Sequence, residues 1–345
     1  MTNNNNLKSI KISLFVLTFI AVVAAMKLSS DILIPFLLSF FIAIISTPAL
    51  FWLTSKNIPT GFALIIVIST ILISGFAIAL LVGSSIDSFT KDLPLYEEKL
   101  HDKAQFIRLF FENLGIKVSD SDISKIFNPA AAMKLVASTL NGLGSALTNS
   151  FMILLTIIFI LLEAASFPEK LKLILNKQNN SLLHFDKFIS KIKQYMAIKT
   201  IISLVTGVVV SIMLMYIGVS YPFLWGILAF LLNYIPNIGS IIAAVPPTLL
   251  AFIQLGTPEA ISVAVGFLFI NLIAGNIIEP KFMGKGLGLS TLVVFLSLLF
   301  WGWVFGPVGM LLSVPLTITV KIAVESNHNL KWIGILLGPE VEKNK

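Results

Sequence analysis

The residues of this sequence best suited to chemistry lie in a short polar stretch, residues 276–288, which reads NIIEPKFMGKGLG between two apolar runs. Asn276 and Glu279 are three residues apart, a spacing that places them on one face of a helix. Burying an unpaired carboxylate is very unfavourable. Glu279 is therefore predicted either to face a polar cavity together with Asn271 and Asn276, or to be an ordinary charge in a water-exposed loop. Pro280 is predicted to end the helix.

Sequence patterns of enzymes and metal sites are absent. The three histidines are far apart and form no HExxH pattern, and there is no cysteine. The chain also has no GxxxxGK[ST] loop and no GxSxG elbow, and its GKGLG stretch has the wrong spacing for a dinucleotide fingerprint. We therefore expect no enzyme activity, no cofactor and no metal site. The net charge of +7 comes from connections between apolar runs, so nucleic-acid binding is not expected either.

The composition predicts an all-α polytopic membrane protein. Hydrophobic residues make up 57% of the chain and charged residues only 12%, and the mean hydropathy is +0.95. Apolar stretches of about the 17–25 residues that cross a bilayer occupy residues 10–28, 32–53, 61–82, 143–162, 201–219 and 260–278. The first has features of a cleaved signal peptide, but the span that follows at once favours a membrane anchor. Two longer apolar tracts, residues 223–252 and 289–320, are interrupted.

The two longer tracts are interrupted by breaks of similar sequence, NYIPNIGSIIAAVPP at residues 233–247 and VFGPVGMLLSVPLT at residues 304–317. Each follows a Trp-Gly pair, and Pro, Gly, Val-Pro and Thr recur in the same order. Unsatisfied backbone groups in lipid cost several kcal/mol each, so a broken helix must be covered by protein or line a watery cavity. Paired breaks of this kind indicate a transporter site built from half-helices. A chance match of residues common in membrane helices is the alternative.

The connections predict the topology. The lysine-rich connection at residues 166–199 favours a cytoplasmic location, which places both termini in the cytoplasm and residues 84–142 outside. Apolar residues at three- and four-residue steps predict an amphipathic helix from Ile86 to Leu114, broken at Pro94 and ended by Gly115. Its apolar stripe fits packing within one subunit or between subunits equally well. A basic amphipathic segment at residues 185–196 is predicted to lie along the membrane surface.

Several long motifs resemble the autoinducer-2 exporter family of bacterial transporters. They include LLNYIPNIGS, GNIIEPKFMGKGLGLSTLVVFLSLLFWGWVFGPVGMLLSVPLT and VKIAVE, together with DILIPFLLSFFIAIIS, FNPAAAM and IKTIISLVTG upstream, so the resemblance covers nearly the whole chain. It implies a multi-pass protein of the bacterial inner membrane with eight spans, hairpin-like broken segments and a homo-oligomeric, pentameric assembly. Some members are associated with autoinducer-2 export and others with sodium/proton exchange, so the cargo does not carry over.

The predicted organisation has six parts. Residues 1–83 hold three spans, 84–142 an extracytoplasmic helical domain, 143–165 the fourth span, 166–199 a cytoplasmic amphipathic connection, 200–325 a transport core with two re-entrant, hairpin-like segments, and 326–345 a cytoplasmic tail. The predicted transport path comprises Asn233, Pro236, Asn237, Gly239, Asn271, Asn276, Glu279, Pro280, Gly306 and Pro307. The predicted hinge or turn residues are Pro246, Gly284, Gly286, Gly309 and Pro315.

Three functions stay open from the sequence. The first is secondary export of a small polar solute, autoinducer-2, by a mobile unit made of both hairpins and residues 260–278. The second is cation/proton exchange, for which Glu279 is the best titrating candidate and Glu163 the next. The third is a membrane interaction protein that transports nothing and acts through its outer domain. The lipid bilayer is a partner in all three.

Overall fold

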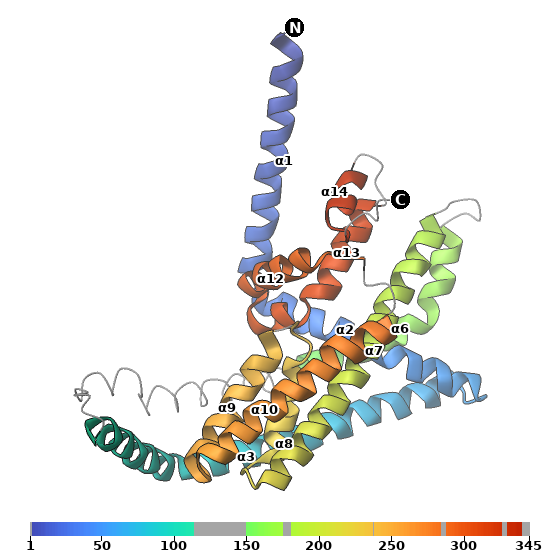
Figure 1. The fold of residues 1–345 in the computed structure, drawn as a ribbon. Coiled ribbons are helices and arrows are strands. Elements are labelled where there is room, and N and C mark those ends of the chain that lie inside the picture. The colour runs from blue at the N-terminus through green and yellow to red at the C-terminus, as the bar shows by residue number, and fades with distance from the viewer. Residues whose placement is uncertain are drawn as a thin grey trace. The chain divides into compact units, whose positions relative to one another are not determined.

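A computed structural model describes residues 2–113, 150–174, 181–236, 238–283, 288–325 and 330–339. Within these ranges the ordered elements are helices and there is no strand (Figure 1), which confirms the all-α prediction. Asn237, Gly284 and Gly286 lie outside the described residues, as do Gly115 and the rest of residues 114–142 of the predicted extracytoplasmic domain.

The helices follow the predicted apolar stretches. Before the first break they are α1 (Thr2–Leu28), α2 (Ser30–Ser55), α3 (Thr60–Asn113), α6 (Ser150–Ile174) and α7 (Ser181–Ile217). After it come α8 (Pro222–Leu232), α9 (Ile238–Gln254), α10 (Thr257–Ile273), the π-helical turn η1 (Ala274–Ile278), α11 (Glu279–Met283), α12 (Thr291–Leu311), α13 (Ser313–Glu325) and α14 (Lys331–Leu336). Among the described residues, five helices are long and apolar enough to cross a membrane, and four shorter apolar helices accompany them.

The chain forms two compact units. Unit 1 consists of Met1–Thr60, Met152–Met196 and Lys285–Lys345, and unit 2 of Gly61–Phe151 and Ala197–Gly284. The first broken tract and residues 260–278 therefore belong to unit 2, whereas the second broken tract belongs to unit 1. The predicted transport core is divided between the units, and its movement as a single body stays a prediction.

Unit 2 has its core where α3, α7, α8, α9 and α10 meet. Trp225 of α8 is fully buried, and its ring stands edge-on to Phe89 of α3 at a centroid distance of 6.4 Å. Gly226 permits this close packing, because a Cβ there would lie 1.8 Å from the hydroxyl oxygen of Ser211 on α7. Helices α9 and α10 then run side by side (Figure 1). The core rests on helix contacts that only small residues allow.

The apolar stripe of α3 packs within the subunit over its first half. Phe89 and Tyr96 are buried in the core of unit 2, and Ile86 and Leu93 pack against that core. The predicted break at Pro94 is wrong, because α3 continues through it to Asn113. A helix-interior proline costs about 3 kcal/mol, whereas burying one large apolar side chain contributes about 1.5–3 kcal/mol. The two buried aromatic rings on either side of the proline therefore offset its cost.

A polar network closes the end of unit 2 at which α7 is joined to α8. Asp92 of α3 accepts hydrogen bonds from the Tyr221 hydroxyl at 2.5 Å and the Tyr96 hydroxyl at 3.3 Å. Gln254, the last residue of α9, donates to the Tyr96 oxygen at 2.9 Å and accepts from the Ser220 amide at 3.0 Å. Burial raises the pKa of Tyr221, and its hydrogen bond to Asp92 raises it further. Tyr221 therefore remains a protonated donor at physiological pH.

Substituting Tyr221 by Phe tests this network. The change removes one hydrogen bond to a carboxylate, a type of bond that contributes about 1.5–3 kcal/mol. We expect a loss of about 1.5 kcal/mol in the free energy of unfolding, measured by chemical denaturation in detergent. Tyr216→Phe is the matched control, because Tyr216 is 93% exposed on α7. Equal effects of both substitutions would show that the network contributes no stability.

Unit 1 joins its N-terminal helices to α12 and α13. Trp301 of α12 stacks on Phe305 at 5.7 Å and donates from its indole Nε1 to the Thr317 hydroxyl at 3.0 Å. Val23 of α1 lies in the same buried cluster. The Lys27 ammonium at the end of α1 is 3.8 Å from the centroid of the Trp303 ring, a cation–π contact. These contacts tie the first helix to the second broken tract.

The segment predicted to lie on the membrane surface is part of a longer helix. Helix α7 runs without interruption from Ser181 to Ile217, and no glycine or proline occurs in it before Gly207. Ile192 and Met196 are buried by protein. Residues 185–196 are therefore part of the same helix as residues 201–217, and their position along the membrane surface stays a prediction.

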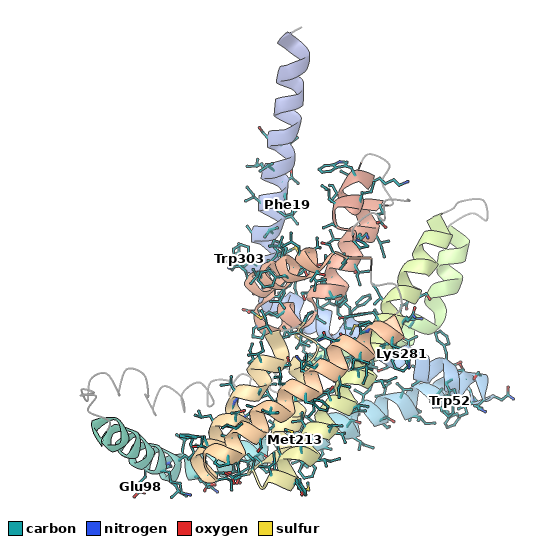
Figure 2. The ribbon with its side chains drawn as sticks, viewed as in Figure 1. Phe19, Trp52, Glu98, Met213, Lys281 and Trp303 are labelled. Carbon is teal, nitrogen blue, oxygen red and sulfur yellow. The ribbon has the colours of Figure 1, made fainter. Side chains whose placement is uncertain are left out.

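Large apolar side chains cover the outer faces of the spans. Phe19 of α1 and Trp52 of α2 project from their helices in Figure 2 and are 55% and 61% exposed. Met213 points inward instead and covers Gly266 of α10, where a Cβ would lie 2.2 Å from its sulfur. Exposed apolar faces of this extent fit contact with lipid rather than water.

Candidate transport site

The first break, between α8 and α9, keeps its backbone groups bonded through tight turns. The Ile235 amide donates to the Leu232 carbonyl at 2.9 Å, and the Ile238 amide donates to the Pro236 carbonyl at 2.6 Å. Helix α8 ends at Leu232, and Pro236, which supplies no amide hydrogen, cannot make the bond that would continue it. The unwound segment is thus compatible with a position inside a membrane, where free backbone groups are costly.

Two side chains of this break bond to α7. The Asn233 side-chain amide donates to the Ser203 hydroxyl at 2.9 Å, and both residues are buried. One residue further along, the Tyr234 hydroxyl donates to the Thr200 hydroxyl at 2.7 Å. Both α7 hydroxyls thus face the unwound segment, and they give this part of unit 2 a polar lining.

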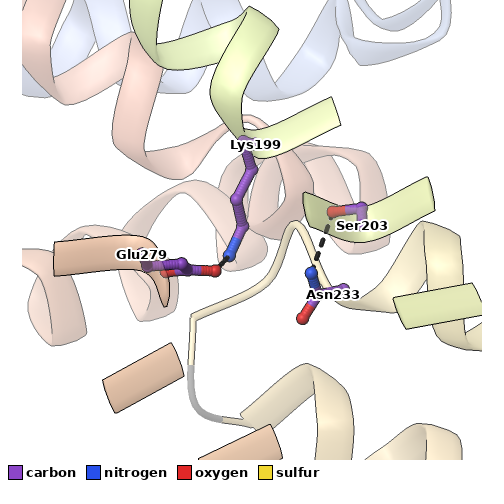
Figure 3. Close-up of polar contacts among 4 residues, drawn as sticks. All are labelled: Lys199, Ser203, Asn233 and Glu279. Atoms are coloured by element: carbon purple, nitrogen blue, oxygen red, sulfur yellow. Dashed lines mark hydrogen bonds and ion pairs between the residues drawn. The ribbon is translucent and has the colours of Figure 1, made fainter. Parts of the chain in front are cut away.

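An ion pair lies beside these hydrogen bonds. The Lys199 ammonium bonds Oε1 of Glu279 (Figure 3). The side chain of Lys199 is only 5% exposed and that of Glu279 22% exposed. Lys199 is four residues before Ser203, so the pair and the Asn233–Ser203 bond lie along one face of α7. Three segments distant in sequence therefore meet in one polar site within unit 2.

A local change in helix geometry positions Glu279. The residues before it form the π-helical turn η1, in which the Glu279 amide donates to the carbonyl of Ala274, five residues back. Such turns occur frequently at functional sites. The predicted stop at Pro280 is wrong, because α11 continues to Met283. Pro280 lies inside a helix that continues from η1, so its missing amide hydrogen removes one helix bond without ending the helix.

The π turn also changes which side chains share a face. Asn276 is exposed, whereas Glu279 bonds the buried Lys199, so the two do not project together as predicted. Asn271 is partly buried on α10. Glu163, the other carboxylate considered, is exposed on α6 in unit 1. Glu279 is therefore the carboxylate that the structure places next to the first break.

The second break lies in unit 1 and is built in a similar way. Gly306 has φ +64° and ψ −149°, a conformation that favours glycine, and it interrupts α12 just before Pro307. Gly309 packs against the Trp301 carbonyl, where a Cβ would lie 1.9 Å away. At the first break, a Cβ on Gly239 would lie 1.8 Å from the Leu232 carbonyl. Both breaks thus depend on a glycine pressed against a backbone carbonyl.

The prolines predicted as turn residues lie within helices. Pro246 is buried in the interior of α9, and Pro315 is in the first turn of α13. Neither is at a turn, and their role as hinge residues stays a prediction. Packing against neighbouring helices allows a proline inside a membrane helix, and the first turn of a helix has no bond for Pro315 to break.

Sequence reasoning missed the α7 side of the site. The sequence places Lys199 among the lysines of the cytoplasmic connection, and it contains no pattern that singles out Thr200 or Ser203. One signal was available, because Lys199 is the last charged residue before a long uncharged stretch that ends at Glu259. A lone charge at the edge of such a stretch needs a partner, but the sequence did not reveal that the partner is Glu279.

Substituting Asn233 by Ala tests the polar lining. The change breaks the bond to buried Ser203, and we expect an approximately tenfold lower initial transport rate, equivalent to about 1.4 kcal/mol. The measurement is uptake into proteoliposomes, with unfolding temperature recorded alongside. Asn276→Ala is the control, because Asn276 is exposed and we expect it to leave the rate unchanged. A normal rate for Asn233→Ala would remove this residue from the site.

Comparison with known proteins places the chain in one group. A family model described as AI-2E family transporter matches residues 14–328. The AI-2 transport protein TqsA of Escherichia coli is 39% identical over 96% of this chain and 96% of its own. A putative transport protein of Haemophilus influenzae is 41% identical over 97% of this chain and 98% of its own, and the putative transport protein YhhT of E. coli is 34% identical over 95% and 94%.

Proposed function

Because this chain belongs to the AI-2E transporter family, we propose that it exports autoinducer-2 across the bacterial inner membrane by a secondary mechanism. The similarity to TqsA, which is named an AI-2 transport protein and matches nearly end to end, supports this cargo. The chain is a multi-pass membrane protein, and proteins of this family are transporters of small solutes. We infer that it is not an enzyme.

The observation that carries the proposal is the polar site at the first break of unit 2. Within it, Asn233, Ser203 and Tyr234 offer amide and hydroxyl groups, and Lys199 and Glu279 offer a paired cation and anion. A small solute with several hydroxyl groups needs both donors and acceptors in place of its water shell. Asn233, Ser203 and Lys199 are buried, and polar contacts are stronger where water is scarce.

Transport requires that this site face each side of the membrane in turn. The unwound segment between α8 and α9 supports such a change, because it can rearrange without breaking a regular helix. We propose that unit 2 carries the cargo, that both termini are cytoplasmic, and that the protein works as a homo-oligomer, a pentamer. The lysine-rich connection supports the orientation, while the resemblance to the exporter family supports the assembly.

Cation/proton exchange is the second candidate, and Glu279 is the observation in its favour. A carboxylate within a candidate membrane-spanning helix, such as the one that holds Glu279, is a usual ligand for a transported cation or proton. The ion pair with Lys199 argues against cation/proton exchange, because the ammonium already neutralises the carboxylate. Export of a neutral polar solute does not require a free carboxylate, which makes it the better match to the site.

Reconstituted transport tests the proposal. Purified protein in proteoliposomes, with a pH-sensitive dye inside, receives autoinducer-2 or sodium in turn. Flux of autoinducer-2 with no sodium-driven proton movement is the expected result, and Asn233→Ala provides the site-directed control. Proton movement driven by sodium alone would instead establish the antiporter, and the absence of both would refute transport of either cargo.

A further inference from the structure

We propose that the Lys199 ammonium is a built-in cation, which occupies the position at which Glu279 would otherwise bind a free monovalent cation. This inference rests on the proposed transport function and concerns whether solute transport is coupled to a free cation. Unit 2 would load and release its solute without a free sodium ion, because the positive charge that compensates Glu279 belongs to the protein.

Geometry supports this role for Lys199. Its ammonium bonds Oε1 of Glu279, and the lysine side chain is only 5% exposed, so the positive charge is held inside the protein rather than in water. An ammonium group and an alkali cation carry the same single charge and are both satisfied by oxygen ligands. A cation that replaced the ammonium would have the same Glu279 carboxylate as its ligand.

The surroundings of the pair contain oxygen atoms that could complete such a site. The hydroxyls of Thr200 and Ser203 each accept one hydrogen bond from the unwound segment. The Ser203 hydroxyl oxygen has two lone pairs, and the bond from Asn233 uses one of them. These oxygens lie on α7, the helix that also carries Lys199. Removing the lysine side chain would therefore leave a carboxylate next to a helix face that carries hydroxyls.

The other charged groups near the pair do not replace Lys199. Lys281 is on the same short helix as Glu279, but it is exposed (Figure 2). Glu259 is at the far end of α10, a distance of about 30 Å at 1.5 Å per helical residue. The titratable neighbour across the site is Tyr234, and its hydroxyl donates to Thr200. Charge balance at Glu279 thus depends on Lys199.

Shortening the lysine side chain should open the site to a free cation. Lys199→Ala leaves Glu279 without its cation and leaves space where the ammonium and its stem lay. The carboxylate is 22% exposed, which provides a route for entry. A small cation such as sodium or methylammonium should then bind there and stabilise the folded protein, because a ligand that binds only the folded state raises its stability.

The test measures unfolding temperature in detergent with no solute present. Wild type, Lys199→Ala and Lys199→Ala/Glu279→Gln are compared in sodium, methylammonium and N-methylglucamine chlorides at equal ionic strength. We expect sodium or methylammonium to raise the unfolding temperature of Lys199→Ala saturably, by about 3–6 °C. Wild type and the double variant should not respond. Lys281→Ala is the control for removal of an exposed lysine, and it should behave as wild type.

Each other outcome has a definite meaning. A folded Lys199→Ala that ignores both cations overturns the proposal, as does a double variant that responds equally. If Lys199→Ala folds only when sodium or methylammonium is present, this dependence on the cation supports the proposal. If Lys199→Ala does not fold in any of the three chloride salts, the proposal is overturned. Since the assay contains no autoinducer-2, a failed export experiment leaves its result intact, and the two proposals fail separately.

Discussion

We expect Glu279→Gln to lower the free energy of unfolding by about 3 kcal/mol, because it leaves the Lys199 ammonium buried without its carboxylate. Removing one partner of a buried ion pair typically costs about 3–5 kcal/mol, and the partial exposure of Glu279 places this pair at the lower end. Lys199→Met should cost a similar amount. The double variant should recover most of the loss, since an apolar side chain and a neutral amide leave no buried charge.

A double-mutant cycle measured by denaturation in detergent provides the check. A coupling free energy of about 2 kcal/mol or more between the two positions is the expected result. Lys281→Met, at an exposed position beside Glu279, is the control and should change stability by less than about 0.5 kcal/mol. Strict additivity of Glu279→Gln and Lys199→Met would contradict the ion pair. Export should fall in both single variants, because each disturbs the site.

The glycines at the two breaks should be the positions least tolerant of an added methyl group. A Cβ on Gly239 would lie 1.8 Å from the Leu232 carbonyl oxygen, and one on Gly309 would lie 1.9 Å from the Trp301 carbonyl oxygen. Both obstructing atoms are backbone, so the helix ends must separate to admit the methyl group. We expect Gly239→Ala and Gly309→Ala each to cost about 3 kcal/mol of stability, at the upper end for overpacking.

Gly75→Ala is the matched control for both glycine variants. Gly75 lies inside α3, and nothing lies within 4 Å of the position that its Cβ would take. Alanine is favoured over glycine in a helix by about 1 kcal/mol, so this variant should be neutral or slightly more stable. Unfolding temperature and transport rate would be measured for all three. If Gly239→Ala or Gly309→Ala matched Gly75→Ala, the close contact at that break would be excluded.

The positions of the spans and of both breaks could be predicted from sequence because they depend on local properties. Apolar runs long enough to cross a bilayer give helices, and Pro236 and Gly306 interrupt two of them, as the motifs NYIPNIG and VFGPVG predict. Glu279 was also recognised, because one charge between apolar runs stands out whatever the fold. In each case a residue and its near neighbours carry the physical cause.

Long-range contacts were decided by tertiary structure. Lys199 and Glu279 are separated by 80 residues, and nothing in the sequence pairs them. Pro94 was predicted to break α3, yet the burial of Phe89 and Tyr96 in the core of unit 2 outweighs its cost. Where local preference and packing disagree, the larger free energy prevails, and packing contacts form only after distant segments have met. The sequence by itself therefore determined the membrane helices, their breaks and one candidate carboxylate, while the tertiary structure determined which cation neutralises it.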